Sequence, residues 1–340
     1  MSETGKYIYG IINSSKHLYA AKNLLEECST NGIHTISYQD ISAVVSDSEM
    51  LDYTHMRKDK LAMLLVGHQK AIEKIMSLGH TIIPMKLGTV AKDEAETKHI
   101  LACGHTIIKD IFGKISNTIE TDITATWGDF NAALKEAGED DEIKEFKEKL
   151  LAAPGGVTVD DQMKIGLMVK EALERKREGY AKEIQDTLKS VSHDFKAHEL
   201  MDDKMAANIA FLINKAKQKD FERKVDELNV EFNEKLNFRC VGPLPPYSFY
   251  TLEIKTLNHE EVDWAKKRLG VITDITSKDE VRKAYQRQAL STHPDRNPNE
   301  SGAGKEFDEV NKAYKILADY CAANEQTNQK ENAILVRVRG

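Results

Sequence analysis

The chain contains 340 residues, of which 41% are hydrophobic and 30% are charged, and its formal net charge is −7. This length allows two or three domains with separate cores, and the composition is that of a soluble globular protein. The negative charge argues against general binding to nucleic acid or to an anionic lipid membrane. No apolar run is long enough to span a bilayer, and the first residues lack a signal-peptide pattern, so we expect a cytoplasmic protein.

Candidate metal and catalytic residues form no recognisable constellation. Scattered cysteines without a CxxC pair predict reduced thiols rather than disulfides or a zinc ribbon: Cys28, Cys103, Cys240 and Cys321. His99 and Cys103 lie one helical turn apart, but no fourth metal ligand is apparent. His193 and His198 are expected to be solvated helix residues, and GAGKE at 302–306 lacks the spacing of a phosphate loop. With no Ser-His-Asp or Cys-His order either, we expect no metal, no cofactor and no catalysis.

Strand and helix patterns alternate over the first 120 residues. β-branched and aromatic residues predict strands at 6–12, 33–38, 41–47 and 81–90, and apolar spacing predicts helices at 17–28 and 56–79. This order predicts an antiparallel sheet with helices on one face, in the ferredoxin-like layout. Residues 91–115 are predicted to continue as a helix. One side of helix 56–79 is expected to carry Leu61, Leu64, Leu65, His68, Ile72, Ile75 and Met76.

A second domain of mixed helices and strands is predicted to open with a strand at 121–130. A long helical stretch runs from about 160 to about 203, and its apolar residues at every third or fourth position are typical of a packing seam against another helix. A strand at 206–213 and a helix at 215–236 follow. Two extended pieces at 237–254 then surround a proline-rich corner.

The third unit is helical. Residues 260–270 predict a short helix ended by Gly270, and Ser277 with Glu280 predicts a capping box for a helix at 278–291. A further helix is predicted at 306–322. Alternating residues at 332–340 predict a strand added to an existing sheet edge.

The predicted fold class is therefore α+β, in four segments. These are a ferredoxin-like N-terminal domain at 1–120, a second α+β domain with long helices at 121–258, a helical unit at 259–322, and a linker with a C-terminal strand at 323–340.

The loop between the last two helices carries His293-Pro294-Asp295. Around it stand RLGV at 268–271, EVRKAYQRQAL at 280–290, HPDRNP at 293–298 and EFDEVNKAYKIL at 306–317. With these segments, residues 262–320 resemble the J-domain of DnaJ-type co-chaperones. The resemblance implies docking on a DnaK-type chaperone and stimulation of its ATPase.

The residues of this unit fit that role physically. Arg282, Lys283 and Arg287 place positive charge on one helix, which suits an acidic partner surface. Pro294 stiffens the loop, so that His293 and Asp295 lose little entropy on docking. Asp295 can then accept a charge-assisted hydrogen bond from a partner arginine.

The unit also departs from the family pattern. Thr292 stands where a tyrosine usually precedes the histidine, the usual aromatic pair of the first helix is reduced to Trp264, and CAANEQTNQKEN replaces the last short helix. We still expect the fold to form around a core of Leu269, Ala284, Tyr285, Leu290, Phe307, Val310 and Leu317.

The preceding chain carries a second resemblance. YIYGII at 7–12, SAVVSD at 42–47, GHQKAIEKIMSLGHTIIPMKLGTVAKDE at 67–94 and VGPLPPYSF at 241–249 are similar to the gas vesicle protein family GvpF/GvpL, over about residues 6–250. The resemblance implies two α+β domains, binding to the main shell protein GvpA and a role in vesicle assembly with other gas vesicle accessory proteins. The corner with Pro243, Pro245 and Pro246 is either packed on the sheet or a recognition edge.

Three functional hypotheses follow. The first is a gas vesicle assembly protein that binds GvpA and recruits a DnaK-type chaperone through the fused J-domain. The second is a minor structural component of the vesicle shell with a degenerate J-like docking unit. The third, an enzyme with a ferredoxin-like small-molecule domain, lacks a convergent polar site. The sequence does not indicate which surface binds GvpA.

Overall fold

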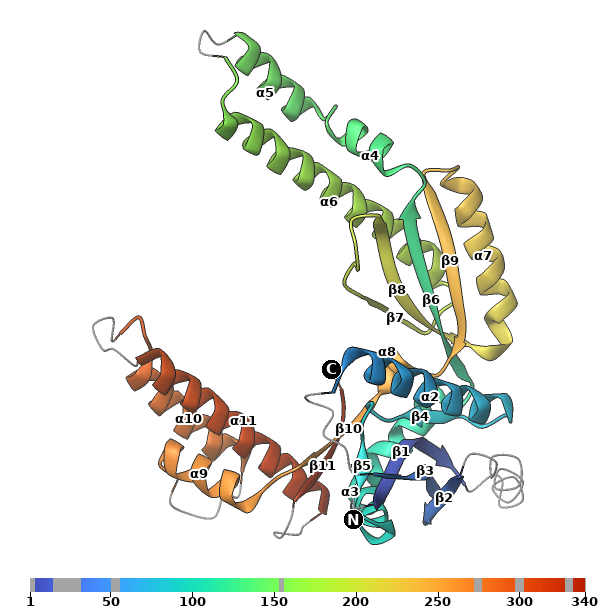
Figure 1. Cartoon of the computed structure of the whole chain (residues 1–340), viewed down its shortest axis with the longest axis vertical. Helices are drawn as coiled ribbons and strands as arrows, with labels where there is room; N and C mark the ends of the chain where they lie inside the picture. Colours follow the sequence, from blue (N-terminus) through green and yellow to red (C-terminus); the bar gives the residue numbers. More distant parts are fainter. Residues whose placement is uncertain are drawn as a thin grey trace. The chain divides into compact units, whose positions relative to one another are not determined.

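The structure is a computed structural model that describes residues 4–14, 32–49, 56–152, 156–271, 277–296, 303–327 and 333–339. Its backbone contacts divide the chain into two compact units, 1–116 with 250–340 and 117–249 (Figure 1). The first unit thus contains both the N-terminal sheet and the C-terminal helices. The helix predicted at 17–28 lies outside the described residues, and the division into four segments stays a prediction.

The sheet of the first unit has the predicted ferredoxin-like strand order. Its strands pair antiparallel in the order β2-β3-β1-β4, which is the order of a βαββαβ sheet. They are β1 (Thr4–Asn13), β2 (Ile33–Tyr38), β3 (Ile41–Glu49) and β4 (Ile82–Pro84).

The strand predicted at 81–90 is wrong in its length, because a turn interrupts it. β4 is followed by the short strand β5 (Val90–Ala91), which also pairs with β1. Between them Thr89 donates from its backbone N to Lys86 O at 3.2 Å, and Gly88 has a positive φ of 84°. Glycine adopts this left-handed conformation without the steric cost that other residues meet.

Helices α2 (Lys58–Ser77) and α3 (Glu94–Ile115) cover opposite faces of this sheet. On β1 the hydroxyl of Tyr7 lies 2.8 Å from Nδ1 of His68 in α2. The next residue, Ile8, belongs to the core cluster that contains Ile108 and Ile111 of α3. Since successive strand residues point to opposite faces, α3 lies on the face of the sheet opposite to α2. The sheet is therefore covered by helices on both faces, whereas the sequence predicted helices on one face.

Only the C-terminal half of α2 packs on the sheet. Its buried residues are His68, Ala71, Ile72 and Ile75. Leu61 and Leu65 are exposed, so the apolar side predicted along the whole helix is confirmed for its second half only.

The second unit contains a four-stranded antiparallel sheet in the order β7-β8-β6-β9. Its elements are β6 (Thr118–Trp127), α4 (Phe130–Ala137), α5 (Asp141–Ala152), α6 (Val159–Lys189), β7 (Asp194–Ala197), β8 (Met205–Asn214), α7 (Gln218–Glu231) and β9 (Leu236–Leu244). Helices α4 and α5 run alongside α6 (Figure 1), and they bury Ala133, Ile143 and Leu173 along the predicted seam.

The long helix predicted at 160–203 is wrong beyond Lys189. Residues 194–197 form the edge strand β7 instead, and His193 N donates to Leu212 O at 2.7 Å as the strand approaches β8. The ring of Phe195 lies 6.2 Å from that of Phe211, so this apolar residue packs on the sheet rather than along a helix seam. The expectation that His193 and His198 are helix residues is likewise wrong.

The proline-rich corner is packed at its second half, whereas Pro243 is exposed. Pro245 and Pro246 are buried, and they lead into the single turn α8 (Tyr247–Tyr250). Ser248 in this turn donates from its N and Oγ to the carboxylate of Glu120 at 2.9 and 2.7 Å. Because Glu120 lies on the central strand β6, these bonds hold the corner on the sheet of the second unit.

Three helices and a strand pair form the C-terminal region of the first unit. They are β10 (Leu252–Thr256), α9 (His259–Leu269), α10 (Lys278–Thr292), α11 (Ala303–Thr327) and β11 (Ile334–Val338). Gly270 ends α9 in the left-handed conformation at φ 68°, as predicted. The Ser277 hydroxyl accepts from Glu280 N at the start of α10, which is the N-cap bond of the predicted capping box. The final strand pairs antiparallel with β10, and α11 continues five residues past the predicted end.

Candidate functional site

The His293-Pro294-Asp295 segment forms a hydrogen-bonded turn directly after α10. Arg296 N donates to His293 O at 3.0 Å, with Pro294 at the second position, which its fixed φ favours. Asp295 N also donates to His293 Nδ1 at 3.2 Å. The imidazole lies edge-on to the ring of Phe307 from α11, with the ring centroids 5.1 Å apart. Short-range bonds and one aromatic contact therefore fix the turn.

The carboxylate of this turn points to solvent, and its imidazole is half-buried. The Asp295 side chain is 88% exposed and that of His293 is 42% exposed, with Nδ1 3.7 Å from Asp295 Oδ2. Beside the turn lies an open pocket of about 620 Å³, lined by Tyr285, Gln286, Ala289, Leu290, His293, Asp295, Arg296 and Phe307. The turn thus offers a carboxylate and an imidazole next to a partly apolar hollow.

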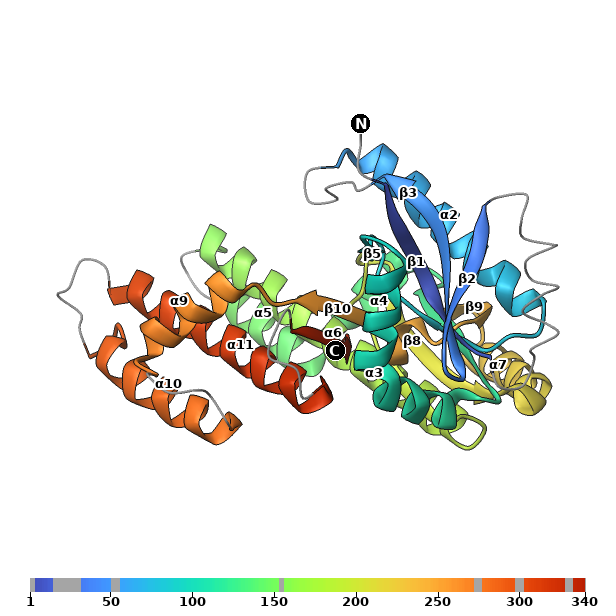
Figure 2. The same ribbon diagram turned by 90° about the horizontal axis from the view of Figure 1, so that it is seen from below.

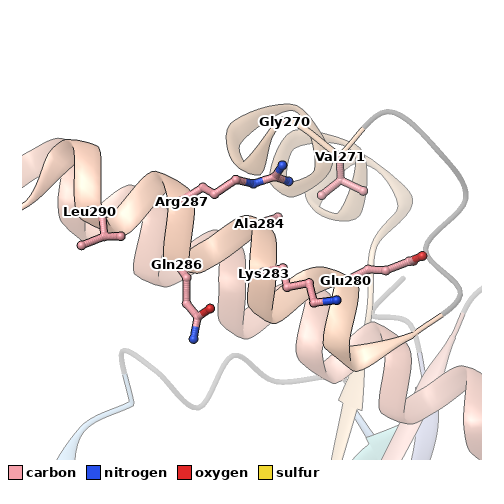
Figure 3. A pocket seen from close by; sticks show the side chains of 8 residues that line it. All are labelled: Gly270, Val271, Glu280, Lys283, Ala284, Gln286, Arg287 and Leu290. Carbon is pink, nitrogen blue, oxygen red and sulfur yellow. The ribbon is translucent and has the colours of Figure 1, made fainter.

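The predicted basic residues lie along α10, next to the turn. Arg282, Lys283 and Arg287 are all exposed. Lys283 and Arg287 line a second open pocket of about 680 Å³ between α10 and the end of α9, together with Gly270, Val271, Glu280, Ala284, Gln286 and Leu290. Figure 3 shows Arg287 reaching along α10 toward the turn at Gly270 and Val271. The structure therefore places all six predicted site residues on α10 and the turn that follows it.

Packing of α9, α10 and α11 sets the position of the turn. Buried Val281 and Ala284 of α10 share a core cluster with Val310 and Leu317 of α11. Tyr285 adds a hydrogen bond from its hydroxyl to Asn311 Oδ1 at 2.8 Å. The two helices are thus held by apolar burial and by a specific polar contact across the hairpin.

Two predicted core residues lie outside the core cluster of these helices. Phe307 is half-buried and lines the pocket beside the turn, and Leu290 is 56% exposed and lines both pockets. The buried residues of α10 are Val281, Ala284 and Thr292, whose helical phase excludes Leu290. The helical period could have revealed this, because two residues along a helix correspond to more than half a turn. Leu290 precedes buried Thr292 by two residues and so points to the opposite side of α10.

Thr292 replaces the usual tyrosine as a buried, hydrogen-bonded residue. Its hydroxyl donates to Gln288 O at 2.9 Å, within the last turn of α10. The hydroxyl is thereby satisfied inside the helix, and it leaves the His293 ring to pack on Phe307. The substitution removes an aromatic side chain next to the turn without leaving a buried polar group unpaired.

Among the described residues, the other candidate ligands do not assemble into a metal centre. His99 Nε2 lies 3.6 Å from Cys103 Sγ, and the described ranges bring together no three His, Cys, Asp or Glu side chains suited to a metal ion. Across the same ranges, no helix is long and apolar enough to cross a membrane.

Sequence reasoning missed a buried polar cluster at the proline-rich corner. Ser248 Oγ lies 2.9 Å from His198 Nε2 as well as 2.7 Å from Glu120 Oε1. The serine stands between the histidine and the acid, whereas a hydrolytic triad needs the histidine in the middle. Burial raises the pKa of Glu120 to about 7 despite the two bonds from Ser248, and burial also raises that of Asp122. The geometry of this cluster is therefore that of hydrogen bonds which hold the corner on the sheet, and it is not that of a catalytic triad.

Comparison with known proteins finds a family match for the N-terminal part of the chain and another for its C-terminal part. Residues 5–251 match the family described as gas vesicle synthesis protein GvpL/GvpF. The chain belongs to this family. Residues 267–323 match the DnaJ domain, so the C-terminal helices of this GvpL/GvpF member are a fused J-domain.

Individual relatives agree with this assignment. Gas vesicle protein F of Microcystis aeruginosa is 24% identical over 60% of this chain and 87% of its own length, and that of a Nostoc strain is 24% identical over 63% and 91%. Chaperone protein DnaJ of Helicobacter hepaticus is 46% identical over 48 residues, which are 14% of this chain and 12% of its own. The crystal structure of GvpF from Anabaena shares the fold, with a TM-score of 0.58 at 20% identity over 73% of this chain and 98% of its own.

Proposed function

We propose that this chain is a gas vesicle assembly factor that holds the shell protein GvpA and brings a DnaK-type chaperone to it. The GvpL/GvpF part would bind GvpA, and the J-domain would recruit the chaperone in the cytoplasm. The observation that carries the proposal is the exposed His293-Pro294-Asp295 turn beside a basic helix, in the same chain as a GvpL/GvpF fold. No catalytic activity of the chain itself is part of the proposal.

The charges and shape of α10 support docking on an acidic partner. Arg282, Lys283 and Arg287 are exposed on one helix, so they can steer an acidic surface toward the turn. The carboxylate of Asp295 is then free to accept a charge-assisted bond, and the hydrogen-bonded turn limits the entropy lost on docking. Leu290 and Phe307 add apolar surface in the adjacent pocket.

ATP turnover of a purified DnaK-type chaperone tests the chaperone half of the proposal. The unaltered chain should raise the steady-state rate, and His293→Gln should abolish the increase. His259→Gln is the matched control, because His259 is also exposed but lies at the start of α9. Stimulation that survives His293→Gln contradicts the chaperone role.

Pull-down against GvpA and other gas vesicle proteins tests the other half. The full chain and a chain in which residues 259–327 are replaced by a flexible linker, so that β11 still completes the core with α3, should both retain GvpA, because the proposal assigns that contact to the GvpL/GvpF part. Loss of GvpA binding only in the linker variant would move the contact to the J-domain.

A second candidate is a minor structural component of the vesicle shell with a degenerate J-like docking unit. The replacement of the usual tyrosine by buried Thr292 favours it. Retention on intact vesicles after a stringent wash, with normal vesicle assembly when residues 293–295 are replaced, would select this candidate.

A further inference from the structure

The β10–β11 ribbon is packed between a helix of the N-terminal domain and a helix of the J-domain (Figure 2). Ile334 and Val336 of β11 belong to the core cluster that α3 forms with the N-terminal sheet. Leu335, between them, belongs to the J-domain cluster with Leu317 of α11. Because successive strand residues point to opposite faces, one short strand closes two cores.

The approach of α3 to this strand is close. A Cβ atom at Gly104 would stand 2.8 Å from Cγ1 of Val336, nearer than real Cβ contacts come. A larger residue at this helix position would therefore push the ribbon away. The absence of a side chain at Gly104 allows β11 to lie directly against α3.

Gln326, near the end of α11, protects the free edge of β11. Its Nε2 donates to Val336 O at 2.7 Å, and Val336 N donates to its Oε1 at 3.2 Å. One side chain thus satisfies both outward backbone groups of Val336, as a neighbouring strand would. This contact lies in the part of α11 that extends past the predicted end of the helix.

A chain of alternating charges crosses the same junction. Arg337 donates to Asp319 of α11 at 3.0 Å and to Glu253 of β10 at 3.2 Å. Lys86, in the turn after β4, donates to Glu253, and Lys255 donates to Asp319 at 2.7 Å. The Lys86 ammonium holds the pKa of Glu253 below its usual range, so this shared carboxylate is ionised near neutral pH. Three cations and two carboxylates join the N-terminal domain to the J-domain.

We infer that Gln326 and Arg337 are positioning residues that fix the J-domain on the N-terminal domain, so that a chaperone bound at the His293 turn acts at one place relative to that domain. The chaperone in this inference rests on the proposed function. A J-domain on a flexible linker would sample a large volume, and the concentration of chaperone near the held client would fall as that volume grows. Docking through β11 keeps the J-domain in one place and so keeps the local concentration of chaperone near the client high.

Pairs of spin labels in the full chain test the docking. Labels go on Asp279→Cys of α10 and Glu73→Cys of α2, both exposed, after Cys28 and Cys240 are changed to serine. The unaltered junction should give a single narrow distance peak, and Gln326→Ala with Arg337→Ala should lose it. Arg339→Ala is the matched control, because it removes an exposed arginine two residues along the same stretch of chain and should keep the peak.

Vesicle formation and ATPase stimulation then separate docking from chaperone contact. The double variant should retain stimulation but lose vesicle formation in cells that carry the gas vesicle genes, whereas His293→Gln should lose both. A broad distribution in the unaltered chain, a peak that stays narrow in the double variant, or full vesicle yield from a broadened double variant would overturn the inference.

Two further arms keep the result interpretable. If circular dichroism shows that the double variant is unfolded, Gln326→Ala alone replaces it, because this change leaves the charge network intact. If the distances respond as expected but His293→Gln retains full stimulation, the proposed chaperone function fails while the docking stands.

Discussion

Two corners of the chain contain proline, and their polar groups meet opposite surroundings. In the turn at 293–296 the Asp295 side chain is 88% exposed, whereas Glu120, which holds the corner at 243–250 through Ser248, is 1% exposed. A polar group in water is free to bind a partner, but a buried one must find its partner inside the chain. Proline stiffens both corners, and burial decides which corner serves recognition and which serves the fold.

The largest effect is expected at the exposed corner. Asp295→Asn should abolish stimulation of a DnaK-type chaperone, because the amide cannot replace the charge of a carboxylate bound to arginine. The thermal midpoint should stay unchanged, because exposed substitutions typically shift stability by no more than about 0.5 kcal/mol. Asp308→Asn, an exposed acid on α11, is the matched control. A lower midpoint for Asp295→Asn would contradict the contrast between the corners.

The buried corner should respond in the reverse way. Ser248→Ala removes a donor 2.7 Å from the Glu120 carboxylate, which should cost about 1–3 kcal/mol of unfolding free energy. Urea unfolding measures the loss, and chaperone stimulation should be unaffected. Ser77→Ala, at the exposed end of α2, should change the unfolding free energy by less than about 0.5 kcal/mol. Equal losses in both variants would show that Ser248 has no special role.

The buried corner should also make the second unit sensitive to pH. Burial raises the pKa of Glu120 from 4.5 to about 7, so between these values the folded unit binds more protons than the unfolded chain. Its unfolding free energy should therefore fall as the pH rises, by up to about 1.4 kcal/mol per pH unit. Glu120→Gln should flatten this dependence.

Buried His68 provides an internal comparison in the first unit. Burial lowers its pKa from 6.5 to about 4, so here the unfolded chain binds more protons and stability rises with pH across that interval. Hydrogen exchange followed residue by residue resolves the two units, and they should change in opposite directions between pH 4.5 and 6.5. A common direction would contradict one of the two assignments.

The difference between local and distant contacts explains how far the sequence could be interpreted. The α9–α11 helices and the His293 turn follow from periodicity and short motifs, because their signals lie within a few residues. The ferredoxin-like strand order follows from the order of strands and helices along the chain. The bond between Ser248 and Glu120 joins residues 128 positions apart, and that between Gln326 and Val336 depends on where β11 pairs. Neither contact has a pattern of its own in the sequence. β7 was missed because Phe195 continues the helical spacing of α6 while packing on a sheet.

The smallest effect is expected from a single charge on α10. Arg287→Gln should weaken chaperone affinity only a few fold, because one exposed charge acts mainly on the rate of encounter and is screened by salt. Titrations should therefore show a difference in chaperone affinity between the variant and the unaltered chain at low salt, and the two affinities should become equal at high salt. Arg239→Gln makes the same change in charge on β9 and should leave the affinity unchanged at both salt concentrations. A loss of affinity that persists at high salt would mean that Arg287 makes a direct, desolvated contact in the pocket beside Gly270. That pocket would then belong to the docking surface, and Arg287 would act by contact rather than by long-range steering.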